Sequence, residues 1–211
     1  MVNVEVSYKG FPIANIPEGQ TGRLACRGKK MVSDVTIAYK KTGISRVAQL
    51  VGRTITELTA DDFEGVEIIG SYVFFTCKEL KKLEFSDSVS QISYQAFAGC
   101  SGLTSLYFPN TVQFIGYESF FNCTGLKNVV IVGNSNLNIE TGAFSSCKAL
   151  EVVDFSQTTV VPKLNNVNAF TNVPTTCKIV VPDALYNSWI SATNWSAVTL
   201  TFVKSSEYTG G

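Results

Sequence analysis

This 211-residue chain contains six cysteines, whose thiols could bind metal, form disulfides or act as nucleophiles, and four of them recur at a nearly fixed interval. The intervals are 23, 23 and 24 residues between Cys77, Cys100, Cys123 and Cys147. A zinc site usually takes paired ligands at a spacing such as C-x-x-C, which does not occur here. Together with Cys26 and Cys177, these residues also lack the framework of a small disulfide-rich domain. Because free cysteine packs as a small buried hydrophobe, we expect a core column of free thiols and no metal.

Few side chains of this sequence could act as a general acid or base. It contains no histidine, which removes Ser-His-Asp and Cys-His catalysis and the usual zinc hydrolases. The adjacent carboxylates Asp61 and Asp62 precede Phe63, and such a pair favours the start of a helical turn, where free N–H groups attract acids. Glycine-rich nucleotide-binding spacings are also missing. We therefore expect a non-enzymatic protein without a cofactor.

The cysteine interval is part of a longer repeat that must position these side chains. Each of the four cysteines follows a phenylalanine by three positions and precedes a leucine by three, at Phe74 and Leu80, Phe97 and Leu103, Phe120 and Leu126, and Phe144 and Leu150. A fifth, decayed unit begins near Leu164 and keeps Ala169 and Phe170 without the cysteine. A fixed period of this length is typical of a leucine-rich-repeat solenoid, in which each coil buries the face that its neighbour exposes.

Apolar residues alternate after the leucine of each unit, which predicts one half-buried strand per coil. The inward positions are Leu83 and Phe85, Leu106 and Phe108, Val129 and Ile131, Val153 and Phe155, and Ile179 and Val181. Since the units are nearly equal in length, we expect these strands to stack in register as a short parallel sheet. The outward positions form two columns that we take as the candidate binding surface: Lys82, Ser105, Asn128, Val152 and Lys178, and beside them Glu84, Tyr107, Val130, Asp154 and Val180.

The centre of this surface is apolar, with Tyr107 and Val130, and its edges are charged. A protein-binding patch usually has this arrangement of an apolar core and a polar rim. The alternative is that a neighbouring chain or the N-terminal part of the same chain covers the patch as packing surface.

The consensus of the units resembles the BspA-type, or Treponema pallidum-type, leucine-rich repeat, with the pattern Ile-Gly-x-x-x-Phe-x-x-Cys-x-x-Leu-x-x-Leu-x-Phe-Pro over about residues 55 to 182. The lead-in from Ile55 to Val66 is similar to the first coil of short members encoded by gut Firmicutes and their phages. The resemblance implies a non-enzymatic surface that binds protein or glycan. It does not name the ligand, because repeat folds serve many partners.

Four regions follow from these patterns: a small β domain at 1–43, a linker and N-terminal capping coil at 44–68, the solenoid at 69–182 and a C-terminal cap at 183–211. Alternating apolar residues around Val4 and Ile37 predict three or four strands in the first region, which we expect to serve assembly or anchoring. The cap is expected to be a helix after Pro182, followed by a strand from Val198 to Val203. Its apolar stripe is expected to cover the last coil, with a sugar platform as the alternative, and consists of Leu185, Tyr186, Trp189 and Ile190.

The charge balance and hydropathy exclude several kinds of partner. Lysine plus arginine and aspartate plus glutamate both number 17, and the one basic cluster, Arg27-Gly28-Lys29-Lys30, is short, so we expect no nucleic-acid partner and no anionic membrane surface. No run of 18 apolar residues occurs, so membrane insertion is not expected. The N-terminus lacks the pattern of a signal peptide. This favours either a leader already removed or another route to the outside, such as assembly into a virion released by lysis.

Two functional hypotheses follow. The first is a virion-associated protein of a phage or prophage, in a tail or head fibre or decoration, whose N-terminal β domain forms a homo-oligomer and whose solenoid serves host attachment or contact with another virion protein. The second is an adhesin on the bacterial cell surface that binds host protein or glycan. In both hypotheses the partner is a macromolecule outside the cell, and no cofactor is involved.

Overall fold

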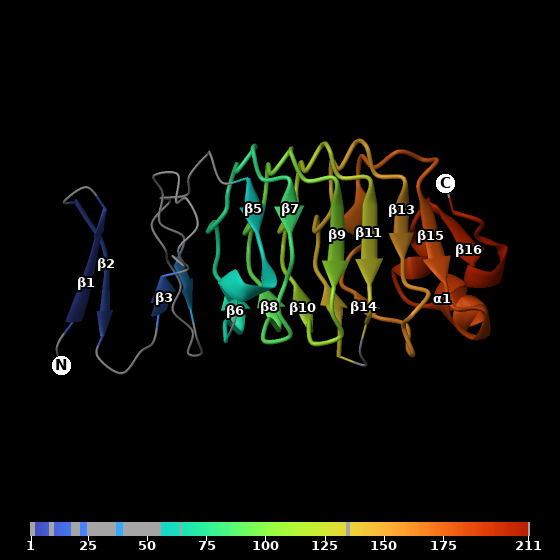
Figure 1. Ribbon diagram of the computed structural model, residues 1–211. Helices are drawn as coiled ribbons and strands as arrows, with labels where there is room; N and C mark the ends of the chain where they lie inside the picture. Colours follow the sequence, from blue (N-terminus) through green and yellow to red (C-terminus); the bar gives the residue numbers. More distant parts are fainter. Residues whose placement is uncertain are drawn as a thin grey trace.

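The structure, a computed structural model, describes four N-terminal strands as backbone elements and residues 56–63, 65–133 and 136–210 with their side chains (Figure 1). The N-terminal strands are β1 (Asn3–Tyr8), β2 (Phe11–Pro17), β3 (Gly22–Leu24) and β4 (Ile37–Tyr39). Strands β1 and β2 form an antiparallel pair, and β3 pairs antiparallel with β4. The proposed boundary at residue 43 and the role of this region remain predictions, and Cys26 lies outside the described residues.

Each coil of the solenoid contributes one strand to each of two parallel stacks (Figure 1). The first sheet contains, in spatial order, β9 (Ser105–Phe108), β11 (Asn128–Ile131), β13 (Val152–Asp154), β15 (Lys178–Val181) and β16 (Thr201–Lys204). Before it lies a two-stranded parallel pair, β5 (Glu57–Leu58) and β7 (Lys82–Leu83). The repeat solenoid with a short parallel sheet is thus confirmed, although β7 pairs with β5 and not with β9.

The second sheet consists of two-residue strands that close each coil on the opposite side. They are β6 (Ile68–Ile69), β8 (Gln91–Ile92), β10 (Phe114–Ile115), β12 (Asn138–Ile139) and β14 (Lys163–Leu164). Strand β4 pairs antiparallel with β6 through Tyr39 and Ile68, so this sheet continues into β4 and β3. The N-terminal strands β3 and β4 therefore share backbone hydrogen bonding with the first coil.

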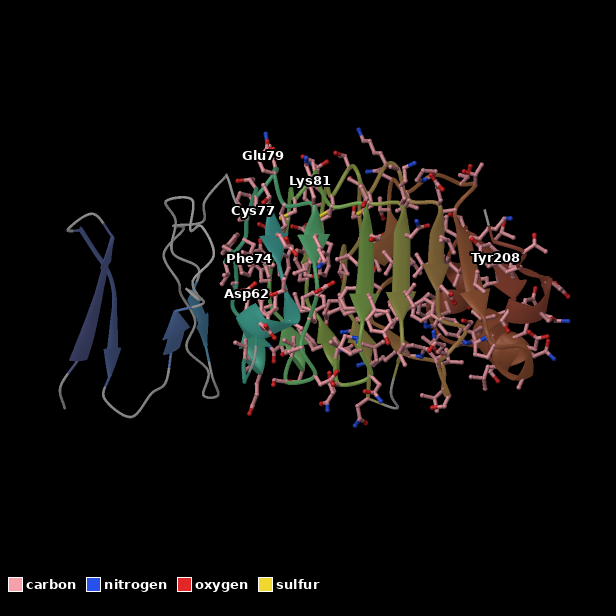
Figure 2. The ribbon with its side chains drawn as sticks, viewed as in Figure 1. Asp62, Phe74, Cys77, Glu79, Lys81 and Tyr208 are labelled. Carbon is pink, nitrogen blue, oxygen red and sulfur yellow. The ribbon has the colours of Figure 1, made fainter. Side chains whose placement is uncertain are left out.

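The core between the two sheets is built from columns of identical residues. The phenylalanines that precede the cysteines stack along the solenoid, with ring centroids 4.8 Å apart for Phe74 and Phe97, 5.3 Å for Phe97 and Phe120, and 5.7 Å for Phe120 and Phe144. Phe170 of the decayed unit continues the stack at 5.7 Å. In Figure 2, Phe74 and Cys77 lie at the end of the solenoid nearer the N-terminus. The aromatic column thus runs through all five coils.

The C-terminal end is covered by short helical turns and the helix α1 (Tyr186–Ser191). The 3-10 turns of the described chain are Ala60–Phe63, Val167–Phe170, Asp183–Leu185, Trp195–Ala197 and Ser205–Glu207. Trp189 and Trp195 are buried against each other and against Phe155, and the Trp195 indole N–H donates to the Pro162 carbonyl at 2.7 Å. The aromatic stripe therefore caps the last coil, as expected, and is not an exposed sugar platform.

Ile190, a member of the predicted apolar stripe of the cap, does not lie on the buried face of α1. Ile190 is 42% exposed, whereas Trp189 is fully buried. A residue that directly follows another lies about 100° around an α-helix, because there are about 3.6 residues per turn. With Trp189 at the centre of the buried face, Ile190 therefore reaches the solvent.

Asp183 connects the 3-10 turn Ser205–Glu207, which follows the final strand, to the start of the cap. The carboxylate accepts hydrogen bonds from the side-chain hydroxyl and backbone N–H of Ser206 and from the hydroxyl of Ser205 at 2.8 Å. These bonds, with those from Ser206 the strongest, lower the pKa of Asp183 from 3.8 to about 2. The charged carboxylate therefore favours the folded state above pH 4, and this contribution is lost as the pH falls from about 4 toward 2.

We expect Asp183→Asn to lower the melting temperature at pH 6 and to have progressively less effect toward pH 2. The reason is that acid neutralises the wild-type carboxylate and removes the same interaction that the substitution removes. Thermal unfolding of both proteins between pH 2 and pH 6 measures the difference. A difference that stays constant over this range would show that the hydrogen bonds do not depend on the charge.

Candidate functional site

The candidate surface lies on the outer face of the first sheet, where the strand register determines which side chains meet. Ser105 pairs with Asn128, Asn128 with Val152, and Val152 with Lys178. The second column is formed in the same way by Tyr107, Val130, Asp154 and Val180. The alternating residues at all ten predicted inward positions are buried. The structure therefore brings together the side chains of β9 to β15 in the two columns expected from the sequence.

Tyr107 is the most exposed large apolar residue of the surface, with 53% of its area accessible. It lies directly beside the half-buried Val130 of the next strand. Ser105 and Asn128, two positions earlier in the same two strands, are exposed. The accessible centre of the face is thus an aromatic ring and an aliphatic side chain bordered by small polar groups.

Charged residues flank this centre and are paired among themselves. The Lys82 ammonium lies 2.9 Å from the Glu84 carboxylate and 3.1 Å from Glu57 of β5. The hydrogen bonds to Glu84 and then to Glu57 raise the pKa of Lys82. Lys127 and Glu151, which directly precede β11 and β13, form a second exposed pair at 3.4 Å. Such exposed pairs contribute little to stability, and they leave the rim polar without a strong excess of either charge.

Two predicted surface residues are not accessible. Val152 is 8% exposed and Val180 is 1% exposed, although both point to the outer face. The last residues of the chain return to this face, where the Tyr208 ring lies 5.7 Å from the Lys178 ammonium (Figure 2). The C-terminal segment thus lies beside Lys178, at the β15 end of the two columns. Asp154 is engaged locally, because its carboxylate accepts from the Ser156 N–H at 2.7 Å.

A second exposed group, which sequence reasoning missed, lies in the turns that follow the second sheet. We call residues 70–76, 93–99, 116–122 and 140–146 the turn segments. They carry three exposed tyrosines, Tyr72, Tyr94 and Tyr117, with 36%, 38% and 43% of their areas accessible. Inter-coil backbone bonds hold them next to one another, since the Tyr72 N–H donates to the Tyr94 carbonyl and the Gln95 N–H to that of Tyr117. Their 22- and 23-residue spacing is close to the repeat, but Tyr72 stands one position later in its unit than Tyr94 does, so the repeat alignment does not place them in one column.

The cysteines occupy the core, as predicted. Five of them, Cys77, Cys100, Cys123, Cys147 and Cys177, are buried free thiols. Each of the three central ones donates from its sulfur to a phenylalanine carbonyl of the preceding coil, at 3.1 Å for Cys100 and Phe74 and 3.3 Å for Cys123 and Phe97. Burial raises the pKa of Cys147 to about 12 and that of Cys123 well above its usual value of 9.0. The thiols of Cys123 and Cys147 are therefore neutral at physiological pH and are poor nucleophiles in this state.

We expect Cys100, Cys123, Cys147 and Cys177 to resist alkylation by iodoacetamide at pH 8 in the native protein. Their folded-state pKa values are raised by burial, so the neutral thiol favours the folded state below pH 9, and this contribution disappears as the pH rises toward 12. Peptide mass spectrometry would locate the label, with urea-unfolded protein as the fully reactive control. Native labelling of Cys123 at the unfolded rate would contradict the buried column.

The remaining candidates for chemistry also have structural roles. Asp61 and Asp62 lie in the 3-10 turn Ala60–Phe63, and the Asp62 carboxylate accepts from the Thr59 N–H at 2.8 Å and from its hydroxyl at 3.1 Å. The expectation that this pair opens a helical turn is confirmed. Among the described residues, no group of three or more cysteine or carboxylate side chains could hold a metal ion. Among the described residues, no helix combines the length and the apolar character that a membrane span requires.

A family model described as the BspA type leucine rich repeat region matches residues 53–176 in six copies, which is more than half of the chain. The chain belongs to the BspA-type leucine-rich-repeat family. BspA-type proteins are known as non-enzymatic repeat proteins, and leucine-rich-repeat domains generally mediate protein interactions. No curated protein sequence matches this BspA-type chain.

Solved structures with the same repeat architecture come from several bacteria. The pneumococcal vaccine antigen PcpA is similar with a TM-score of 0.50 and 15% identity, over 80% of this chain and 46% of that one. The leucine-rich-repeat protein of Treponema pallidum matches with a TM-score of 0.40 and 19% identity, over 87% of this chain and 95% of that one. A leucine-rich cell surface protein from Faecalibacterium prausnitzii matches with a TM-score of 0.35 and 19% identity, over 70% and 59%. The BspA-type chain thus spans less than half of the length of the pneumococcal antigen.

Proposed function

We propose that this BspA-type protein is a non-enzymatic binding module that contacts a protein partner through the outer face of its first sheet. The observation that carries the proposal is the exposed Tyr107 beside Val130 at the centre of a sheet whose strands are held in register. A tyrosine presents a large, rigid apolar area together with a hydroxyl, which is why this residue is enriched at interfaces.

The distribution of polarity on the face supports a protein partner. The accessible centre is apolar, Ser105 and Asn128 beside it are exposed, and the charged residues on either side pair with one another at 2.9 to 3.4 Å. A partner that covers Tyr107 and Val130 would bury apolar area without breaking the ion pairs at the rim. Interfaces with this arrangement derive most of their affinity from a few central side chains.

Two settings outside the cell are consistent with this module. The first is a virion, in which the solenoid contacts a host receptor or another virion protein and the N-terminal strands attach it to the particle. The second is the bacterial cell surface, where the module would act as an adhesin for host protein or glycan. The fold shared with the pneumococcal vaccine antigen supports the second setting.

The function is tested by measuring how the fluorescently labelled full chain adheres to intact bacterial cells and to human epithelial cells. Binding to bacterial cells favours the virion setting, and binding to epithelial cells favours the cell-surface setting. For whichever cells bind the wild type, Tyr107→Ser is expected to reduce binding about tenfold or more, as for other central aromatic residues. Ile190→Ser is the matched control, because it removes an exposed apolar residue from α1 and leaves the sheet unchanged. Unchanged adhesion of Tyr107→Ser would refute the assigned face, and adhesion that resists protease treatment of the cells would refute a protein partner.

We also propose that the N-terminal strands form a homo-oligomer. Among the described strands, β1 and β2 pair only with each other, and an isolated two-stranded hairpin is only marginally stable in water. Pairing of its free edges with copies in other chains would stabilise it. Light scattering should then give an oligomeric mass for the full chain and a monomeric mass after deletion of residues 1–43. A monomeric full chain would exclude this assembly.

A further inference from the structure

The three exposed tyrosines of the turn segments form a continuous aromatic row. The rings of Tyr72 and Tyr94 meet edge to face with centroids 5.0 Å apart, and those of Tyr94 and Tyr117 stack at 5.5 Å with planes 20° apart. The row lies in the turns after the second sheet, so it belongs to a different part of the coils from Tyr107. Exposed aromatic rings that line up in this way form an interaction surface of their own.

The row ends at Tyr117. The next coil has Thr141 in the corresponding position and Gly142 after it, so no aromatic ring of the described residues covers the second face of the Tyr117 ring. The next residue, Glu118, carries a carboxylate whose charge and hydrogen bond raise the pKa of Tyr117. The last ring of the row is therefore neutral, exposed and adjacent to a negative charge.

The charged residues of the turn segments are all of one sign. Within the four turn segments, the charged residues are Glu118 and Glu140, and both are acidic. Neither carboxylate takes part in any ion pair formed between the described residues. The region thus carries two negative charges that no described cation neutralises.

Neutral amide groups hold both carboxylates in place. The Gln95 amide donates to Glu118, and Glu140 accepts from the Asn138 amide at 3.1 Å and from the Asn165 amide. These bonds fix the orientation of the carboxylates across neighbouring coils without removing their charge. Fixed charges of this kind bind a cation at a smaller cost in side-chain entropy than mobile ones.

We propose that the end of the tyrosine row, at Tyr117, Glu118 and Glu140, binds a lysine or arginine side chain from a basic segment of a protein partner. The ring attracts a cation to its face, and the two carboxylates supply the opposite charge. A neutral glycan would leave both carboxylate charges without a counter-charge, which favours a cation over a glycan. This surface is separate from the outer face of the first sheet and does not depend on the function proposed for that face.

Fluorescence anisotropy of a labelled hexapeptide of alternating lysine and arginine, titrated with the full chain at about 50 mM salt, tests the proposal. Glu118→Gln with Glu140→Gln should weaken binding about tenfold, because glutamine can keep the acceptor role but removes both charges. Tyr117→Leu should weaken binding about two- to fivefold, because it keeps the apolar bulk and removes the aromatic face. Ile190→Ser on α1 is the control and should leave the affinity unchanged, because this exposed residue lies outside both surfaces.

Three results would overturn the assignment. The first is no binding of the basic peptide by the wild type under conditions in which the protein is folded by circular dichroism. The second is equal affinity of Tyr117→Leu and wild type, which would reduce the effect to general charge attraction. The third is binding of a neutral oligosaccharide, such as maltohexaose, that Tyr117→Leu abolishes, since the site would then recognise sugar. Because Tyr117 and both carboxylates are on the surface, these variants keep the core intact.

Discussion

Replacement of Phe120 by alanine is expected to lower the free energy of unfolding by about 3 to 5 kcal/mol. The side chain is fully buried at the middle of the phenylalanine column. Its ring stacks on Phe97 at 5.3 Å and on Phe144 at 5.7 Å, and it meets Phe108 edge to face at 5.4 Å. Alanine would leave a cavity between two coils that the neighbouring rings cannot fill, because their own coils hold them in place.

The neighbouring Phe121 provides a matched control. It has the same side chain in the same turn segment but is only half-buried, so Phe121→Ala should cost about 1 to 2 kcal/mol. Urea unfolding followed by circular dichroism measures both variants. Similar losses for the two positions would show that the stacked column is not the main source of stability in the central coils.

Replacement of Gly125 by alanine is expected to cost about 1 to 3 kcal/mol. A Cβ atom at this position would lie 2.3 Å from the Ser101 carbonyl oxygen and 3.1 Å from that of Leu103. Both atoms belong to the backbone of the preceding coil, so the two coils would have to move apart. Gly102 makes the same close approach one coil earlier, with the Lys78 carbonyl 2.4 Å from its ideal Cβ position.

The control for this prediction is Gly70→Ala in the first described repeat unit. The nearest atom to a Cβ there is the Val73 Cγ2 at 3.4 Å, which is an ordinary contact. Alanine should therefore be tolerated or should stabilise the protein by up to about 1 kcal/mol, since it reduces the entropy of the unfolded chain. Thermal unfolding measures the stability of both variants. An equal loss for Gly70→Ala and Gly125→Ala would contradict the conclusion that Gly125 is needed for the close approach of two coils.

The sequence alone determined the solenoid, the strand positions and the burial of the cysteines. These features depend on a local pattern repeated at an interval of 23 or 24 residues, and each repetition imposes the same geometry. Leu106 and Phe108 must face inward once Tyr107 faces outward, because side chains alternate along a strand. Equal unit lengths then place Tyr107 beside Val130 without any long-range information.

Only the tertiary structure decided which parts of the two faces are accessible. Val152 and Val180 have the alternation of exposed residues but are 8% and 1% exposed, and no local pattern predicts this burial. The tyrosine row could not be predicted from the repeat alignment either, because Tyr72 follows Ile69 by three positions whereas Tyr94 follows Ile92 by two. Alignment by the repeat separates these two rings, whereas the stacking of the turns brings their centroids within 5.0 Å. The repeat fixed each coil, and the contacts between coils and ends determined the surfaces that can bind.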